Sequence, residues 1–429
     1  MRHLLILALV LASFTMSAQS PPFEMVEPES LGFSSERLMR INKKMDQYIS
    51  ENRTAYIQTL IARNGEVFHF KSFGNADIES GKVHQSDHIF RIASLTKPVT
   101  AVALMILLEE GHFQLDDEVS NFIPEFRDFK VLVEENGERK LVDPKSPITI
   151  KQLLTHTSGL GYYFDVTGLC NSYWDCPAGL YANNYIDTLY IQSNLLDGNA
   201  TKGYFIEKLS ELPLRYQPGE DLYYSIGLDV VGYLVEVISG IPLDQYMKEM
   251  IFSPLGMKDT DFFVPSDKLN RFTTNYYQDP EGTPQAFDRP DNSTYRTKPS
   301  FFSGGAGLVS TMRDYLRFAQ MLLNKGEFNG VRILSPQTVE FMTIDHLQSY
   351  DLFYPGHGLG LGFVTVEDIT LINLPGNKGE YSATGAFNTY LWIDPEDKII
   401  AMVWTQLWPY AGSPLAQDFK VLVNQALIE

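Results

Sequence analysis

The stretch RIASLTKPVTAVALMILLEEG, residues 91–111, decides how the rest of this chain is interpreted. The residues from Pro98 to Leu108 are apolar on nearly every side, so the helix that they predict must be buried. Pro98 fits the first turn of that helix, where a missing N–H does no harm. Ser94 and Lys97 stand three residues apart at the helix start, which places the hydroxyl and the amine on one face.

The Ser94 hydroxyl and the Lys97 amine together could act as a nucleophile and its general base. The helix dipole and burial both disfavour a charged ammonium at a helix start. Lys97 can then be neutral part of the time and take the proton from Ser94, which becomes a nucleophile. A chain of this length contains about one Ser-x-x-Lys by chance, so the apolar helix behind the pattern is what makes it informative. The alternative is a Ser94 that only caps the helix and a Lys97 that is a solvated charge.

The two ends of the chain predict strands, and the middle predicts helices. An amphipathic helix at 35–52 precedes two β-rich runs around Asn64-Gly65, a strong hairpin signal. The other elements expected from apolar periodicity are strands at 56–62, 66–73, 361–366, 389–393 and 399–405 and a closing helix at 415–428. In the middle, Thr311-x-x-Asp314 opens a helix as a capping box, and Gly326 follows the end of that helix. We therefore expect an α/β (α+β) fold, in which an antiparallel sheet built from both termini and flanked by helices carries an inserted, mostly helical lobe.

The N-terminus resembles an export signal. Arg2 and His3 precede an apolar run at 4–14, and small residues follow at Ser17 and Ala18. The run is too short to span a bilayer, and no Cys follows it that would carry a lipid anchor. The alternative is a buried N-terminal helix. We expect a signal peptide at 1–18, a periplasmic or secreted location, and one domain at 24–429, with 24–97 and 325–429 in the sheet lobe and 98–324 in the helical lobe.

The charge balance excludes some partners. The chain has 34 Lys+Arg against 53 Asp+Glu, a formal charge of −19, which repels nucleic acid and anionic membranes. We expect neither nucleic acid nor stable membrane insertion. Cys170 and Cys176 lie together in GLCNSYWDCP and can close a disulfide loop in an oxidising compartment, or they can be two free thiols. No His or carboxylate cluster accompanies them, so they predict no zinc site.

Some common hydrolase signatures are missing. The sequence has no Gly-x-Ser-x-Gly nucleophile elbow and no His-Glu-x-x-His. His156, in LLTHTSGL, is the most suggestive histidine, but a hydrogen-bonded structural role fits it better. A Ser-His-Asp triad is therefore poorly supported.

Three short motifs together resemble a known family. SLTK at 94–97 is similar to the Ser-x-x-Lys motif of β-lactamases, penicillin-binding proteins and related esterases. A second motif with Tyr should follow in the helical lobe, and Tyr224-Ser225-Ile226 supplies it. A third motif should lie on a late strand, where Ala383-Thr384-Gly385 replaces the Lys-Thr-Gly of lactamases or the Trp-Gly-Gly frequent in esterases. Four further stretches agree with the pattern of this family: LLTHTSGL, IFSPLGM, FFSGGAGLVSTMRDY and LGLGF. The resemblance therefore runs from about residue 30 to the end.

Two departures from the lactamase pattern concern the substrate. Class C β-lactamases carry an Asn that contacts the substrate amide where this chain has Ile226. Ala383 replaces the Lys whose charge meets the carboxylate of a β-lactam, and a site built for a charged group loses affinity without that partner. Both changes point to neutral esters and look like the pattern of the class C-like family VIII carboxylesterases and acyltransferases.

The resemblance implies a mechanism. Ser94 forms an acyl-enzyme, and Lys97 and Tyr224 share the role of general base as a coupled pair. The backbone N–H groups of Ser94 and Ala386 hold the oxyanion, and no metal or organic cofactor is needed. The side chains expected to contact substrate are Ile226, Ala383, Thr384 and Gly385. The segment 161–194, which is rich in Tyr and contains Trp174, forms a lid over the site or is a packed surface loop.

We therefore expect a secreted serine hydrolase that hydrolyses or transfers the acyl groups of small neutral carboxylic esters. The alternatives are a β-lactamase or D-amino-acid-specific peptidase that acts on amides, a non-catalytic binding protein that kept the penicillin-binding shape, and a scaffold without a pocket. The oligomeric state is not encoded visibly.

Overall fold

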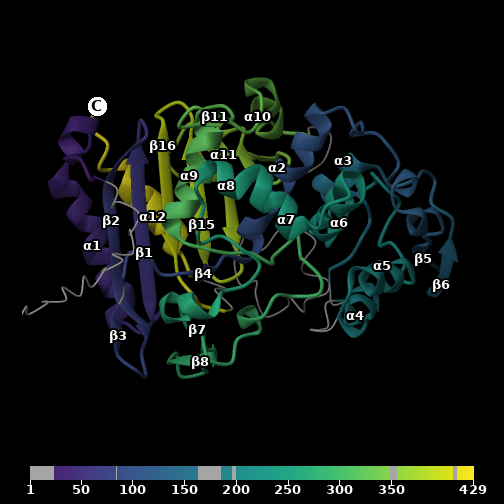
Figure 1. Ribbon diagram of the computed structural model, residues 1–429, viewed down its shortest axis with the longest axis horizontal. Coiled ribbons are helices and arrows are strands. Elements are labelled where there is room, and N and C mark those ends of the chain that lie inside the picture. Colours follow the sequence, from purple (N-terminus) through teal and green to yellow (C-terminus); the bar gives the residue numbers. More distant parts are fainter. Residues whose placement is uncertain (1–23, 84, 163–184, 196–199, 348–354, 409–412) are drawn as a thin grey trace, which may run out of the picture.

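An eight-stranded antiparallel sheet occupies one side of the molecule and most helices the other (Figure 1). The computed structural model describes residues 24–83, 85–162, 185–195, 200–347, 355–408 and 413–429. The strand order is β12-β13-β14-β15-β16-β1-β2-β3. The strands are β1 (Tyr56–Arg63), β2 (Glu66–Asp77), β3 (Lys82–Val83), β12 (His357–Leu359), β13 (Val364–Val366), β14 (Tyr381–Gly385), β15 (Thr389–Asp394) and β16 (Ile399–Trp404).

The two ends of the chain meet where β16 pairs with β1, with Gln58 opposite Trp404 and Arg63 opposite Ile399. This pairing joins a strand from residues 56–63 to one from residues 399–404, and it confirms the expected sheet built from both termini. Asn64-Gly65 closes the β1–β2 hairpin, and both residues have the positive φ that this turn requires.

Helices fill most of the middle of the chain. The α-helices are α1 (Ser35–Ser50), α2 (Thr96–Glu109), α3 (Ile150–Leu154), α4 (Tyr185–Gln192), α5 (Lys202–Ser210), α6 (Gly227–Ser239), α7 (Leu243–Met247), α8 (Ser253–Leu255), α9 (Met312–Leu323), α10 (Pro336–Met342), α11 (Ile369–Ile372) and α12 (Leu415–Asn424). Short strand pairs accompany them: β4 (Phe90–Arg91) with β9 (Val309–Ser310), β5 (Val131–Glu135) with β6 (Glu138–Val142), β7 (Asn275–Gln278) with β8 (Pro284–Asp288), and β10 (Glu327–Phe328) with β11 (Val331–Arg332). The middle is therefore mostly helical, as expected.

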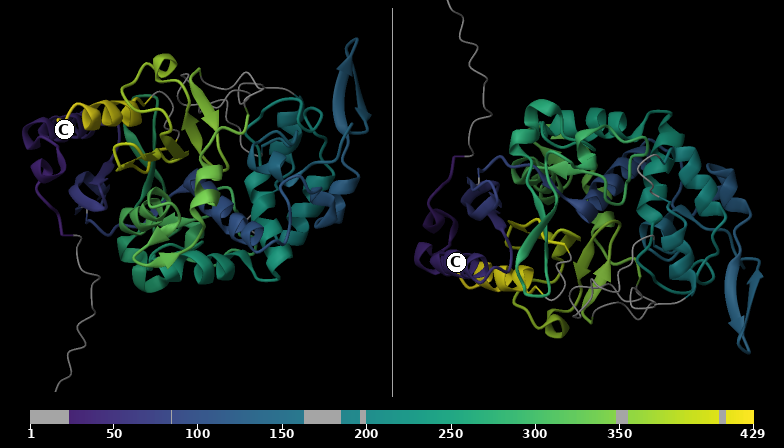
Figure 2. Two further views of the ribbon diagram at one scale, coloured as in Figure 1. Left: turned by 90° about the horizontal axis from the view of Figure 1, so that it is seen from above. Right: turned by 90° about the horizontal axis from the view of Figure 1, so that it is seen from below.

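The sheet has a hydrophobic core on each face because side chains alternate along a strand. Ile57, Ile61 and Trp392 pack with α1 and α12 on one face. Leu60 and Leu391 belong to the larger core on the other face, which also holds α2, α6 and α9. Figure 2 shows α1 and α12 side by side along the outer face of the sheet. Fully burying one large aliphatic side chain contributes about 1.5–3 kcal/mol, so these two cores hold the layers together.

The helix α2 lies in the larger core. All its residues from Thr96 to Leu107 are buried, which confirms the burial expected from its apolar sequence. The larger core draws residues from both the 24–97 and 98–324 parts of the chain, and no boundary between lobes is marked within it. The division into lobes at those residue numbers stays a prediction.

Some element limits differ from the sequence expectation. The strand expected at 361–366 begins only at Val364, because Gly362 adopts a positive φ and packs against α2, with its added Cβ 3.1 Å from Ala101 Cβ. Thr311 caps α9 as expected, by accepting a hydrogen bond from the Asp314 N–H. A capping box also needs the Asp314 carboxylate to accept the N–H of Thr311. That part of the prediction is wrong, because the carboxylate instead accepts a hydrogen bond from the Asp259 N–H.

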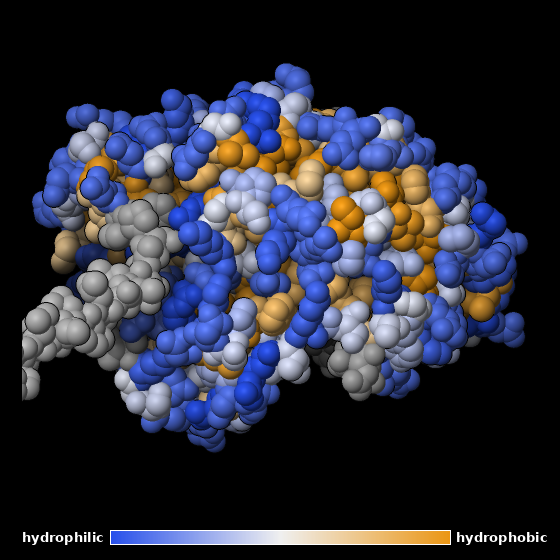
Figure 3. All heavy atoms as spheres, in the orientation of Figure 1, coloured by the Kyte–Doolittle hydropathy of each residue, from blue (hydrophilic) through white to orange (hydrophobic). Residues whose placement is uncertain are grey.

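Hydrophilic side chains cover the rim of the face seen in Figure 3, and hydrophobic side chains gather between the positions of α8 and α6. The β5–β6 hairpin stands out from the end of the helical part (Figure 2). Among the described residues, no helix combines the length and apolar character needed to cross a membrane. The expected signal peptide, the pair Cys170 and Cys176 and most of the expected lid, 163–184, lie outside the described residues.

Two buried histidines predict that the protein loses stability in mild acid. Burial lowers the pKa of His69, which is hydrogen-bonded to Thr59, to about 3, and it lowers the pKa of His156 to about 3 as well. Both groups keep the ordinary value near 6.5 when unfolded, so the unfolded chain takes up protons first as the pH falls. The contribution of these histidines to the free energy of unfolding is therefore fully present above pH 6.5 and is lost as the pH falls from 6.5 towards 3, by about 1 kcal/mol for each histidine at pH 5.5.

Urea unfolding at pH 7.5 and 5.5 measures this loss. His69→Gln is expected to reduce it, while His112→Gln, at an exposed position after α2, is expected to leave it unchanged. Equal losses in the wild type and His69→Gln would contradict the assignment to His69.

Candidate active site

The chain enters the site through a strained turn. Ser94 lies in a single 3-10 turn, Ala93–Leu95, between β4 and α2. Ala93 before it has a φ of 44°, in the left-handed region that an L-residue with a side chain adopts only when its surroundings compel it. Here the Ile92 N–H donates to Leu308 O at 3.1 Å and the Leu95 N–H donates to Ile92 O at 3.1 Å. These bonds hold the turn that carries Ser94.

The structure brings the side chains of Lys97 and Tyr224, both named from the sequence motifs, together at Ser94. The Lys97 Nζ donates to Ser94 Oγ at 3.1 Å, and the Tyr224 hydroxyl donates to the same oxygen at 2.8 Å. The Lys97 Nζ also lies 4.6 Å from the centre of the Tyr224 ring. Lys97 is 5% exposed, whereas Ser94 and Tyr224 are only half-buried, so the hydroxyl pair faces an accessible side and the amine lies behind it. This arrangement can remove a proton from Ser94 and return it.

A run of glycines holds the amine. The Lys97 Nζ donates a second hydrogen bond to Gly305 O at 2.8 Å, and the Thr100 hydroxyl donates to Gly304 O at 2.7 Å. A Cβ added to Gly304 would lie 2.5 Å from Leu228 O in α6, and one added to Gly305 would lie 2.4 Å from Asp229 Oδ2. The segment therefore needs glycine to pass between α2 and α6.

The third motif lies beside the nucleophile at the end of β14. A Cβ on Gly385 would lie 2.2 Å from Ile92 O, so only glycine allows the strand to approach the residues before Ser94 this closely. Thr389 confirms the approach by donating its hydroxyl to Ile92 O at 3.2 Å. Ala386, which we expect to supply an oxyanion N–H, directly follows Gly385.

The expected substrate contacts differ in their exposure. Thr384 is exposed and Gly385 lies at the close approach just described. Ala383 is 8% exposed and belongs to the core. The expected contact between the Ile226 side chain and substrate is wrong. Ile226 is 0% exposed, and a side chain with no accessible surface cannot touch a substrate. It packs in the larger core, and its N–H donates to Gly161 O at 3.0 Å.

Comparison with known proteins places this geometry in a family. Residues 41–424 match the family model described as Beta-lactamase. An uncharacterized protein of Mycobacterium tuberculosis is 34% identical over 368 residues, which are 82% of this chain and 85% of the relative. The chain belongs to the β-lactamase family.

Two further relatives in the comparison have names that describe an activity. Esterase EstB of Burkholderia gladioli is 32% identical over 302 residues, covering 65% of this chain and 68% of EstB. The solved structure of EstCE1, a hydrolase with promiscuous acyltransferase activity, superposes with a TM-score of 0.73 at 26% identity, covering 90% of this chain and 98% of EstCE1. The chain is a serine hydrolase of the β-lactamase superfamily, and its relatives include esterases.

One carboxylate of this β-lactamase-family site was not predicted from the sequence. Asp229 is 1% exposed in the first turn of α6, and its Oδ1 accepts hydrogen bonds from the Ser303 hydroxyl and, at 3.1 Å, from the Gly305 N–H. Its Oδ2 is buried without a hydrogen-bond partner among the described residues. Burial raises the pKa of Asp229, and the positive charge of Lys97 opposes that rise. The five-residue spacing from Tyr224 was the available signal, but spacing alone cannot show that the carboxyl faces the amine.

His156 supports the tyrosine and takes no direct part in the hydroxyl cluster. The Ser225 N–H donates to His156 Nδ1 at 3.1 Å, which places the ring proton on Nε2. The His156 ring lies against that of Tyr224, with centroids 4.7 Å apart. Burial lowers the pKa of His156 to about 3, so the ring is neutral. This agrees with the structural role expected for it. Among the described residues, no group of three or more side chains is arranged to hold a metal ion.

The Asp229 carboxylate predicts a shift in the pH profile of nucleophile reactivity. Asp229→Asn removes a negative charge that favours the protonated, inactive form of the site. The acid limb of the labelling rate of Ser94 by a fluorophosphonate is expected to move to lower pH, by on the order of one unit.

Asp314→Asn is the matched control, because burial raises the pKa of this α9 carboxyl to about 6 and its partners include Asp259, Thr260 and Arg317. In Asp314→Asn, the acid limb of the Ser94 labelling rate should stay at the wild-type pH. An unmoved limb in folded Asp229→Asn would show that Asp229 carries no charge during labelling.

Proposed function

We propose that this protein transfers the acyl groups of neutral carboxylic esters through an acyl-enzyme on Ser94. The observation that carries the proposal is the convergence of the Lys97 amine and the Tyr224 hydroxyl on Ser94 Oγ, at 3.1 and 2.8 Å. A hydroxyl with two such neighbours is equipped to lose its proton as it attacks. A purely structural serine or a non-catalytic binding protein has no need of a buried amine and a phenol at one oxygen.

Acylation begins when Ser94 Oγ attacks the ester carbonyl carbon and its proton passes to the Lys97–Tyr224 pair. The N–H groups of Ser94 and Ala386 donate to the oxyanion of the tetrahedral intermediate. When the intermediate collapses, the carbon–oxygen bond to the alcohol breaks and the pair returns the proton to the leaving alkoxide. Proton transfer of this kind contributes about 10²–10⁴ in rate, and each oxyanion donor about 10²–10³.

Deacylation repeats these steps with a second nucleophile. Water gives a carboxylic acid, and an alcohol gives a new ester, so one site can hydrolyse and transfer. The names of EstB, an esterase, and of EstCE1, a hydrolase with promiscuous acyltransferase activity, support both outcomes for a site of this kind.

The substrate class follows from the charge of the third motif. Ala383 offers no ammonium group where β-lactam and peptide carboxylates would need one, and its small side chain belongs to the core. An uncharged ester avoids the cost of bringing an unpaired carboxylate into the site. A β-lactamase or D-amino-acid-specific peptidase is the second candidate, since the fold alone does not select the substrate. We also infer, from the apolar N-terminal run, that the protein is exported to the periplasm or beyond.

A substrate panel tests the proposed class. p-Nitrophenyl acetate and butyrate are expected to be hydrolysed, while nitrocefin and a D-alanyl-D-alanine peptide are turned over slowly or not at all. Ser94→Ala should lower kcat/KM for the esters by about 10³ or more, because it removes the nucleophile. Ser239→Ala, at the C-terminus of α6, is the control and should behave as wild type. Faster turnover of nitrocefin than of esters would reverse the order of the two candidates.

A double-mutant cycle tests the shared base. Tyr224→Phe keeps the ring and removes the hydroxyl, and Lys97→Met keeps the length and removes the amine. Each is expected to lower kcat for p-nitrophenyl acetate by about 10²–10⁴ with little change in KM, because the lost interaction acts in the transition state. The double variant should be little slower than the slower single variant. Fully additive losses would contradict a pair that acts as one unit.

A further inference from the structure

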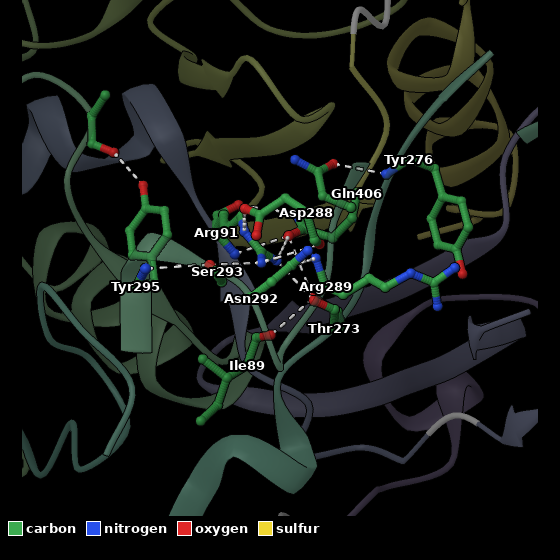
Figure 4. Close-up of polar contacts among 12 residues, drawn as sticks. Ile89, Arg91, Thr273, Tyr276, Asp288, Arg289, Asn292, Ser293, Tyr295 and Gln406 are labelled. Atoms are coloured by element: carbon green, nitrogen blue, oxygen red, sulfur yellow. Dashed lines mark hydrogen bonds and ion pairs between the residues drawn. The ribbon is translucent and has the colours of Figure 1, made fainter. Parts of the chain in front are cut away.

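A buried cluster of polar side chains around Arg91 has no part in the proposed mechanism. Figure 4 shows its polar contacts. Arg91 is 0% exposed at the end of β4, three residues before Ser94. Its guanidinium donates to Asp288 Oδ2 at 2.6 Å, to Thr273 O at 2.7 Å and to Ser293 Oγ at 3.1 Å. The Phe272 ring lies 3.9 Å away. Each nitrogen of the guanidinium therefore has a hydrogen-bond acceptor.

Gln406 joins this cluster to the backbone that leads to Ser94. Its side-chain amide pairs with the main chain of Arg91 in both directions: the Arg91 N–H donates to Oε1 at 3.0 Å, and Nε2 donates to Arg91 O at 3.0 Å. The Arg91 guanidinium also donates to Oε1 at 3.4 Å, which fixes which end of the amide is the oxygen. Gln406 is 2% exposed, and it gives Arg91 the two hydrogen bonds that a neighbouring strand would otherwise supply.

The residues on either side of Gln406 hold the turn after the third motif. The Thr405 N–H donates to Asn388 O at 3.1 Å, and the Thr405 hydroxyl donates to Phe387 O at 3.1 Å. The Leu407 N–H donates to the same Phe387 oxygen at 3.3 Å. Phe387 and Asn388 directly follow Ala386. One short segment, 405–407, is therefore bonded both to the strand before Ser94 and to the turn after Ala386.

We propose that Gln406 is a positioning residue that sets the distance between the two oxyanion N–H groups, those of Ser94 and Ala386. The inference rests on the proposed function, because it assigns these two amides to the oxyanion. The two amides are 292 positions apart in the sequence. Segment 405–407 links the stretches that carry them by hydrogen bonds to Arg91 and Phe387, in addition to the direct bond from the Thr389 hydroxyl to Ile92 O. Oxyanion donors act only at about 2.7–3.1 Å from the developing charge, and a misplacement of about 1 Å can cost 10²-fold in rate.

Two variants loosen the segment from different sides. Gln406→Met keeps the length of the side chain and removes its bonds to Arg91, and Thr405→Val keeps the shape and removes the bond to Phe387. Both are expected to lower kcat for p-nitrophenyl acetate roughly ten- to a hundredfold with KM nearly unchanged, and to weaken an alkylboronic acid inhibitor in the same proportion, because the boronate oxygen occupies the oxyanion position.

The control is Ser293→Ala, which removes one bond of Arg91 and leaves Gln406 and Thr405 in place. It should keep the wild-type kcat and boronate affinity even where its melting temperature falls. All rates are divided by the concentration of Ser94 that a fluorophosphonate titrates, so that unfolded protein does not count as slow enzyme. Gln406→Glu, of equal size, keeps the acceptor and loses the donor, and it provides a second variant of the same residue.

The outcomes separate the inference from the function on which it rests. A wild type that neither hydrolyses esters nor reacts with the fluorophosphonate would overturn the proposed function. An active wild type with unchanged kcat and boronate affinity in Gln406→Met, Gln406→Glu and Thr405→Val would overturn the positioning role alone. Equal losses in Ser293→Ala would also overturn it, since they would show a general effect of the arginine cluster.

Discussion

The close packing of α2 against α6 across a run of glycines is the constraint on which the site depends. Gly304 lies so near Leu228 O and Gly232 that even a methyl group would separate the helices. That approach brings Tyr224, just before α6, onto the hydroxyl at the start of α2. It also places the Gly305 carbonyl where the Lys97 amine needs a hydrogen-bond acceptor. A wider spacing would take the Gly305 acceptor away from the buried amine and leave it Ser94 Oγ alone of these two partners, which is costly in a core.

The buried polar groups around this contact are compensated in different ways. Arg91 has a carboxylate, a carbonyl and a hydroxyl as acceptors for its donors. One carboxylate oxygen of Asp229 has no hydrogen-bond partner among the described residues. The positive charge that acts on this carboxylate is that of Lys97. Incomplete compensation of this kind is found where charge must change during a reaction, whereas complete compensation suits a scaffold. The two groups of buried polar side chains thus have different physical roles.

Local patterns in the sequence predicted much of the fold. The helix at 35–52, the Asn64-Gly65 hairpin and the closing helix all appear close to their expected positions, because periodicity and turn residues act over a few neighbours. The strand expected at 361–366 was partly wrong, since the positive φ of Gly362 serves its packing against α2, a distant element. The Ile226 contact was wrong for a related reason. A motif places a residue beside the site, but only packing decides whether its side chain faces the substrate or the core.

By itself, the sequence determined the buried helix with Ser94 and Lys97 on one face, the order of the three motifs and the family to which the chain belongs. These properties depend on spacing within a turn of helix or on the order of short segments. Only the tertiary structure decided that Asp229 lies behind the amine, that His156 braces Tyr224 and that Gln406 bridges two segments of the site. These contacts join residues that are tens to hundreds of positions apart, and such distances close only when the cores of the sheet and helices pack.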